Sequence, residues 1–148
     1  MYDRPDATEL IEAARMHLET AVIPAVKADR KLYFQTLVAI NVLKIVEREH
    51  VLAPGHAAAE WTRLNDLEDT SAPVPPTLAA LRAALADRNA QLCADIRSGK
   101  YDEAPEDLFD HLKATVIEQL EVANPRFLAR LTAEDADPSR DAWYRRGG

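Results

Sequence analysis

The chain has 148 residues, with 18 basic against 25 acidic side chains and therefore a net charge of −7. It has only four glycines, and two of these are its last two residues. β-Sandwiches and barrels need frequent turns, which usually contain glycine, and α/β nucleotide-binding folds need a glycine-rich phosphate loop. Binding to nucleic acid or to an anionic membrane needs a concentrated basic surface, which this charge balance argues against. We therefore expect an all-α protein that binds neither nucleic acid nor a membrane.

The cysteine content and the N-terminal sequence indicate the compartment. A single cysteine, Cys93, cannot form a disulfide within the chain. Residues 1–6 are polar and acidic and lack the basic start and apolar run of a signal peptide. The most apolar stretch, residues 32–46, is shorter than the roughly 18 apolar residues of a membrane span and includes a lysine. We therefore expect a cytoplasmic protein.

Residues 6–26 have the pattern of a first amphipathic helix. Asp6 and Glu9 have the spacing of a capping box, in which each side chain accepts a hydrogen bond from the backbone of the other. From Leu10 to Val26 an apolar residue stands at every fourth position, which gives the helix an apolar stripe. Pro24 lies inside this pattern, and its ring crowds the carbonyl four residues earlier. The sequence therefore predicts a kink at Pro24.

A second helix is predicted over residues 30–51, and it is apolar around most of its circumference. Such a helix is usually central in a fold. Only a narrow polar strip is expected to reach water: Asn41, Lys44 and Arg48. The dipeptide Pro54-Gly55 is expected to end this helix, and a short third helix should follow over about residues 57–68.

The second half of the chain begins with a proline-rich run over residues 69–76, which favours polyproline geometry and a stiff connector. The next helix is predicted from about residue 77 to Gly99, because glycine adopts the left-handed conformation that often ends a helix. A further helix is predicted over residues 105–123, with an apolar stripe of Leu108, Leu112, Val116 and Leu120. The dipeptide Asn124-Pro125 then has the pattern of an N-cap followed by proline at the first helical position, and it predicts a short last helix.

These elements predict an antiparallel helical bundle of four main helices plus two short ones. Short links at residues 27–29 and 99–104 should make the helices on either side of them antiparallel neighbours. The bundle is expected to form one domain over residues 1–133. Residues 134–148 are expected to form a polar C-terminal tail.

The strongest chemical motif is Glu47-x-x-His50 on the second predicted helix. Two such motifs, with further glutamates, form the di-iron carboxylate sites of helical bundles. The chain has no second copy, because none of its other three histidines follows an acidic residue at that spacing. The favoured interpretation is a solvated turn at a helix end. We expect no metal, no cofactor and no catalytic residue.

Four other positions were weighed as functional candidates. His17 lies on the apolar side of the first helix, where it is either a hydrogen-bonded core or rim residue or a general base. Cys93 is interpreted as a small buried residue, and His111 as the partner of Asp107 one helical turn earlier. Asn41 is more informative, because an interior asparagine needs hydrogen-bond partners. We expect it to be partly buried at a contact with another helix or with a second subunit.

Three blocks of sequence, in matching order over about residues 2–128, resemble a bacterial family called domain of unknown function 6285. The first block is Asp3-Arg4-Pro5 followed by Glu9-Leu10, and the second is the run from Val38 to Glu49. The third joins the run from His111 to Val116 with that from Asn124 to Leu128. The resemblance implies no assigned activity. It implies a small companion of phosphotransferase-family (aminoglycoside-phosphotransferase-like) proteins and acyl-CoA dehydrogenases, which tend to be encoded nearby.

Two functions remain open. The favoured one is a non-catalytic accessory protein that binds or regulates a kinase-like phosphotransferase or an acyl-CoA-handling enzyme, with a second copy of the chain as a further partner. The other is a small ligand-binding or enzymatic bundle that uses His17 or the pair Glu47/His50, with arginines gripping an anion. The residues expected to contact a ligand or a partner are Arg4, Asn41, Arg48, Asn124 and Arg126.

Overall fold

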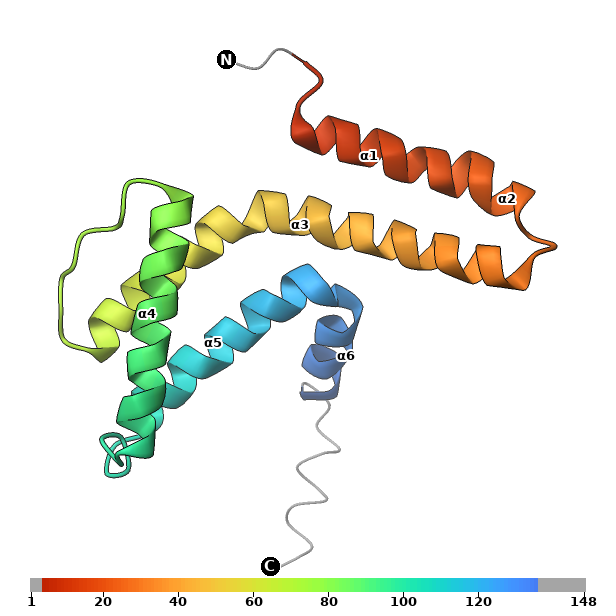
Figure 1. Ribbon diagram of the computed structural model, residues 1–148. Helices are drawn as coiled ribbons and strands as arrows, with labels where there is room; N and C mark the ends of the chain where they lie inside the picture. Colours follow the sequence, from red (N-terminus) through yellow and green to blue (C-terminus); the bar gives the residue numbers. More distant parts are fainter. Residues whose placement is uncertain (1–3, 136–148) are drawn as a thin grey trace, which may run out of the picture. The chain divides into compact units, whose positions relative to one another are not determined.

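A computed structural model of the chain describes residues 4–135, and its regular elements are all helices (Figure 1). In chain order they are α1 (Ala7–His17), the π-helix η1 (Leu18–Val22), α2 (Ile23–Ala25), α3 (Arg30–Leu67), α4 (Leu78–Arg97), α5 (Glu106–Ala123) and α6 (Pro125–Asp135). The all-α prediction is confirmed. Among the described residues no helix is long and apolar enough to cross a membrane. The predicted polar tail lies outside the described residues from position 136 onwards.

The described residues form two compact units, which divide within α3 between Gly55 and His56. The first unit contains α1, η1, α2 and the beginning of α3. The second unit contains the end of α3 with α4, α5 and α6. The joining of all helices into one antiparallel bundle domain stays a prediction.

The start of α1 is fixed by the capping box that the sequence predicts. Asp6 Oδ1 accepts a hydrogen bond from the Glu9 N–H at 2.9 Å, and Glu9 Oε2 accepts one from the Asp6 N–H at 2.8 Å. These two bonds satisfy backbone donors that have no partner inside the first turn of a helix.

The irregularity predicted at Pro24 is present as a π-helical turn just ahead of it. In this turn, η1, the Ile23 N–H donates to the Leu18 carbonyl. Pro24 has no N–H, and its ring crowds the preceding turn. A single wider turn is one of the ways in which a helix accommodates such a disturbance.

Helix α3 continues through Pro54, where the sequence predicts a break. The predicted helix end near Val51 and the separate short helix from residue 57 are therefore wrong. A proline inside a helix removes one backbone hydrogen bond, but the turns that follow it bury Ala57 and Trp61 in a hydrophobic core. Tertiary packing of this kind routinely overrides a local preference against helix.

The first unit is an antiparallel hairpin of α1 with the part of α3 that ends at Gly55 (Figure 1). Among its described residues the one buried hydrophobic side chain is Ile40, which is 5% exposed. The prediction that this part of α3 is central is wrong, because each helix of a two-helix hairpin has only one neighbour to cover it. Seven of its large apolar side chains are exposed: Leu32, Phe34, Leu37, Val38, Val42, Val46 and Val51.

The second unit has a hydrophobic core built from α4, α5 and the last turns of α3. Its buried residues are Ala57, Trp61, Leu64, Leu81, Leu85, Leu92 and Leu108. Helix α5 departs from its predicted stripe, because Leu108 is buried but Leu112 and Val116 are exposed. Residues spaced by four advance about 40° around a helix with each step. The stripe therefore turns away from the core along α5.

The proline-rich connector before α4 is tied to this core. The Trp61 indole N–H and the Asn65 side-chain amide both donate to the Ala72 carbonyl, each at 2.9 Å. The Arg88 guanidinium lies 4.5 Å from the centre of the Trp61 ring and also donates to Asn65 and Glu68. Because a cation is attracted to the face of an indole ring, these contacts hold the connector, α3 and α4 together.

The boundaries of α4, α5 and α6 agree with the predictions. Gly99 follows the last turn of α4 with a φ of 82°, a left-handed conformation that glycine adopts without a steric cost. Helix α5 ends at Ala123, and the Asn124 side chain accepts a hydrogen bond from the Phe127 N–H at 3.1 Å. Asn124 therefore caps α6, whose first residue is Pro125.

Candidate interaction surfaces

Charged side chains join the two helices of the hairpin. Arg15 donates to Glu47 at 2.9 Å and to Glu19 at 3.0 Å, and the Lys44 ammonium lies 2.6 Å from Glu19. The hydrogen bond with Glu47 raises the pKa of Arg15, and the hydrogen bond with Lys44 lowers the pKa of Glu19. These ion pairs hold one face of α3 against α1.

The Glu47-x-x-His50 motif is therefore not a solvated helix end. The Glu47 carboxylate is largely covered and lies against Arg15, whereas His50 is exposed in the middle of α3. In the part of the chain that the structure describes, no group of three or more His, Cys, Asp and Glu side chains could hold a metal ion. Two further interpretations also change: His17 is exposed on α1, and the predicted burial of Cys93 is wrong because Cys93 is exposed on α4.

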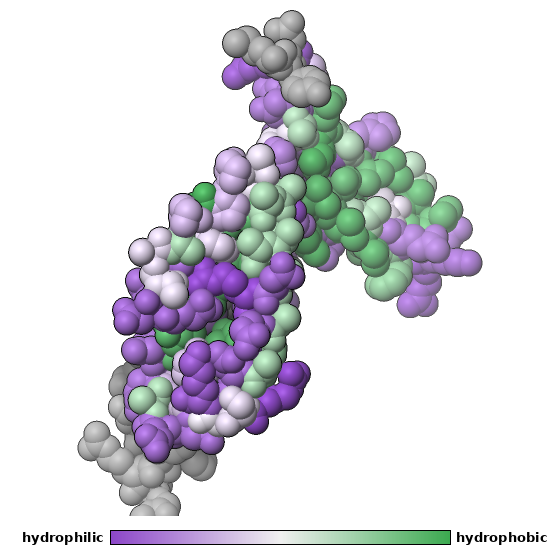
Figure 2. Space-filling model, turned by 60° about the vertical axis from the view of Figure 1, so that its left-hand side comes forward, coloured by the Kyte–Doolittle hydropathy of each residue, from purple (hydrophilic) through white to green (hydrophobic). Residues whose placement is uncertain are grey.

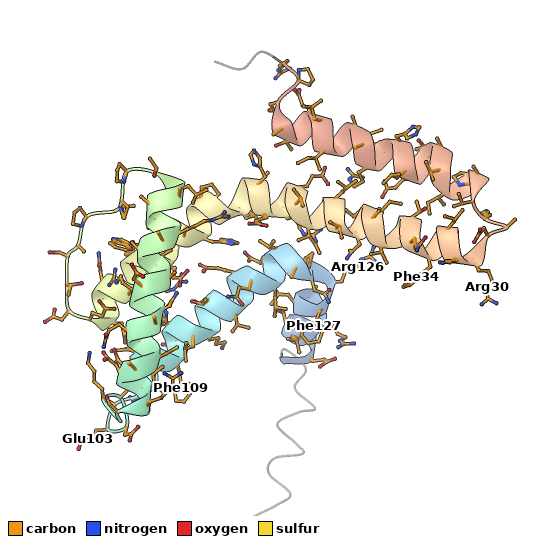
Figure 3. The ribbon with its side chains drawn as sticks, in the orientation of Figure 1. Arg30, Phe34, Glu103, Phe109, Arg126 and Phe127 are labelled. Atoms are coloured by element: carbon orange, nitrogen blue, oxygen red, sulfur yellow. The ribbon has the colours of Figure 1, made fainter. Side chains whose placement is uncertain are left out.

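The face of α3 opposite α1 carries an exposed apolar stripe. A helix turns by about 100° per residue, so four hydrophobic residues lie on the side opposite the buried Ile40: Phe34, Val38, Val42 and Val46, the α3 stripe. Their side chains are between 39% and 66% exposed. Figure 3 shows Phe34 on the side of α3 that points away from α1, and Figure 2 shows hydrophobic residues gathered over the hairpin. The α3 stripe is therefore a candidate interaction surface.

A second apolar surface is a groove of about 420 Å³ between α5 and α6. Three of its lining residues, Leu112, Val116 and Leu120, belong to the α5 stripe that the sequence predicts. The other lining residues are Phe109, Lys113, Ile117, Leu128, Leu131 and Thr132. A hydrophobic groove between two helices can receive the apolar face of a third helix.

A polar pocket of about 280 Å³ in the second unit is lined by His111, Arg63, Leu67 and three aspartates, Asp66, Asp107 and Asp110. His111 is only 4% exposed, and its Nδ1 has no hydrogen-bond partner among the described residues. Burial, and after it the positive charge of Arg63, lowers the pKa of His111. Its imidazole is therefore neutral at pH 7. None of the other five lining side chains carries a hydroxyl or thiol for this imidazole to activate.

Arg63 is held by Glu118 rather than left open to a ligand. Two guanidinium nitrogens donate to the two oxygens of the Glu118 carboxylate, each at 2.7 Å. A weaker hydrogen bond of 3.4 Å runs from Arg63 to Thr115 Oγ1. This bidentate geometry is the strong form of an arginine–carboxylate pair, and it joins α3 to α5.

Three of the five predicted contact residues belong to the hairpin. Arg4 is exposed and lies 3.8 Å from Glu9, and Arg48 is half-buried with an interaction inside the chain. Asn41 is exposed at the edge of the α3 stripe. Its predicted burial against another helix of the chain is therefore wrong, while a contact with a second subunit stays a prediction.

The other two predicted contact residues lie at the start of α6. Asn124 is the helix cap described above, which gives this residue a structural role. Arg126 is exposed in the first turn, next to Phe127 (Figure 3). A ligand contact of either residue stays a prediction.

Sequence analysis missed the polar contacts of the second unit. His111 stands three residues after Leu108, a spacing that places both on one face of a helix, so its burial had a local signal. The pair of Arg63 with Glu118 had none, because 55 positions separate the two residues.

The comparisons with known proteins agree with the resemblance noted in the sequence. The family model described as domain of unknown function (DUF6285) matches residues 24–127, a range that contains all of α3, α4 and α5. No curated protein and no solved structure matches the chain. Since the family model covers more than half of the chain, this protein belongs to the DUF6285 family.

Proposed function

We propose that this chain is a non-catalytic helical accessory protein that binds a partner protein in the groove between α5 and α6. The observation that carries the proposal is the exposure of Leu112 and Val116, which line this groove. Their spacing is that of a helix face that packs against another helix. An amphipathic helix of the partner would cover them and complete a layer of three helices.

The polar margin of the groove favours an acidic partner helix. Lys113 is the ionisable residue among those that line the groove. A basic side chain beside an apolar groove attracts a helix that carries an acidic residue next to its apolar face.

The family resemblance suggests which partners to test. It names phosphotransferase-family (aminoglycoside-phosphotransferase-like) proteins and acyl-CoA dehydrogenases, and we propose that the accessory protein binds or regulates one of them in the bacterial cytoplasm. The proposal also keeps the expectation that neighbouring helices pack antiparallel, with four main helices and two short ones.

The test is a titration of each purified candidate enzyme against the wild-type protein and two variants, by calorimetry. Val116→Asp places a charge in the groove, and Val74→Asp makes the same change at a similarly exposed valine in the connector. We expect Val116→Asp to weaken binding by at least about tenfold, which corresponds to about 1.4 kcal/mol, and Val74→Asp to leave it unchanged. Equal effects of the two variants, or no binding by either enzyme, would contradict the proposal.

A second candidate function, the binding of an anionic amphiphile, is favoured by the size of the same groove. Its volume of about 420 Å³ lies within the range of small-molecule sites, roughly 300–1,000 Å³. Lys113 could pair with an anionic head group there. Saturable binding of a fatty acid that Val116→Asp abolishes, without binding of either enzyme, would favour this second function.

A further inference from the structure

We propose that the α3 stripe is the contact between two copies of this chain, which pack with their α3 helices antiparallel about a two-fold axis at residue 40. This interface lies on the hairpin and does not depend on the function proposed for the groove of α5 and α6. Its evidence is the order of residues along one face of α3, their exposure and their charges.

The residues of the stripe stand at equal distances on either side of position 40. Val38 and Val42 stand two residues to either side of position 40, and Phe34 and Val46 stand six residues to either side. Nine residues to either side are Lys31 and Glu49, both exposed. At about 100° per residue all six lie on the half of α3 that is turned away from Ile40. The face therefore carries apolar residues at matched distances from position 40, apart from Gln35, which is matched with Ile45, and it has opposite charges at its ends.

In a symmetric contact between identical chains, residue i contacts residue j while j contacts i. Antiparallel packing about position 40 places Val38 at the level of Val42, and Phe34 at the level of Val46, of the other copy. It also brings Lys31 of each copy next to Glu49 of the other, so that two pairs of opposite charges close the ends of the stripe. Parallel packing would instead set lysine beside lysine and glutamate beside glutamate.

The hairpin supplies the rest of the geometry. One face of α3 is held to α1 by the ion pairs of Arg15 and Lys44, and the stripe occupies the opposite face. Two hairpins joined at their stripes form four helices in layers, the arrangement in which apolar helix faces are covered on both sides. Asn41 lies at the edge of this contact, where a polar residue restricts the register of two packed helices.

The contact is small, and the association should therefore be reversible. Positions 31 and 49 are about 27 Å apart along a helix that rises 1.5 Å per residue. One helix pair of this length buries less than the roughly 800 Å² per partner of a standard stable interface. Glu49 already has an interaction within its own chain, and the intermolecular pair with Lys31 would add to it.

The test is sedimentation equilibrium of the full chain at protein concentrations from about 1 to about 100 µM, the range suited to weak association. We expect a monomer–dimer equilibrium for the wild-type protein. Val42→Asp should raise the dissociation constant at least about tenfold, because the charge enters the symmetric contact twice. The matched control is Val51→Asp, at an exposed valine on the α1-facing side of α3, and it should leave the dissociation constant unchanged.

The register is tested by exchanging the two end charges. Lys31→Glu alone should weaken the dimer, and Lys31→Glu combined with Glu49→Lys should restore it, while circular dichroism reports the helix content of every variant. A wild-type protein that stays monomeric over the whole range would overturn the proposal. So would equal effects of Val42→Asp and Val51→Asp, or a charge exchange that does not restore association.

Discussion

The hairpin and the second unit of this chain bury very different shares of their apolar side chains. The part of α3 in the hairpin is rich in valine and leucine, yet Ile40 is the one buried hydrophobic residue among those described in this unit. The second unit uses three helices that converge on Trp61 and Leu64, and Leu64 has no exposed area. The helices of the hairpin are joined by ion pairs around one buried residue, whereas the second unit has a hydrophobic core of seven buried residues.

The difference shows how the number of neighbouring helices decides burial. A helix that is apolar on several sides needs a neighbour on each of those sides. Helix α3 has such neighbours after His56, where α4 and α5 cover it, whereas before Gly55 the long helix beside it in its own unit is α1. The same helix is therefore a core element at one end and carries an open apolar face at the other.

The largest effect on stability should come from truncating the core of the second unit. Leu64→Ala should lower the free energy of unfolding by about 2–5 kcal/mol, because the side chain is completely enclosed. Ile40→Ala should cost at most about half as much, since a hairpin can close around the lost volume or admit water. Urea unfolding at low protein concentration measures both. An equal loss for the two variants would show that the hairpin has a core of its own.

The loss of an ion pair should also have different effects in the two units. Arg63→Met leaves the half-buried Glu118 carboxylate unpaired, and we expect a loss of about 1–3 kcal/mol in the free energy of global unfolding. Arg63→Met combined with Glu118→Leu should recover part of this loss, because no stranded charge remains. Arg15→Met should instead act within the hairpin, as faster hydrogen exchange of α1. Faster hydrogen exchange in α4 after Arg15→Met would contradict the expectation that the effect stays within the hairpin.

The buried imidazole of His111 makes the stability of the second unit depend on pH. Burial lowers the pKa of His111 from its ordinary value of 6.5, so the unfolded chain binds this proton more readily than the folded one. The stability that depends on neutral His111 is complete above pH 6.5 and is lost as the pH falls below that value towards the lowered pKa. The stability of the wild-type protein relative to His111→Gln should therefore decline from pH 7.5 to 5. A difference that is constant over this range would contradict the assignment.

The smallest effect on the free energy of unfolding should come from a substitution in the α3 stripe. Val42→Asp changes an exposed side chain, and the free energy of unfolding of the isolated chain should change by no more than about 0.5 kcal/mol. The same variant is expected to have a large effect on association. A loss of several kcal/mol at low protein concentration would show that Val42 packs inside its own chain.

Local signals in the sequence predicted the ends of helices well. The capping box of Asp6 with Glu9, the Gly99 terminus and the Asn124 cap each depend on residues a few positions apart, and the structure has all three. Pro54 was misjudged because its effect is not local: the burial of Trp61 in the following turns stabilises the helix that proline disfavours.

The buried side chains were harder to predict than the helical residues, for a related reason. Apolar periodicity shows which side of a helix requires cover, but it does not show whether the cover comes from the same chain. Val38 and Leu81 both stand in apolar helical patterns, and one is exposed while the other is buried. The contacts of Arg63 with Glu118 join residues far apart in sequence, so neither partner could be identified from its neighbours.

Hydrogen exchange at two protein concentrations tests most directly whether the hairpin is completed by a second copy. If it is, the amides of α3 from Phe34 to Val46 should exchange more slowly as the concentration rises, because association stabilises only the region that it covers. The amides of α4 from Leu81 to Leu92 should exchange at the same rate at both concentrations. Protection of the α3 stripe that equals that of α4 at the lower concentration, and does not change at the higher one, would contradict the account.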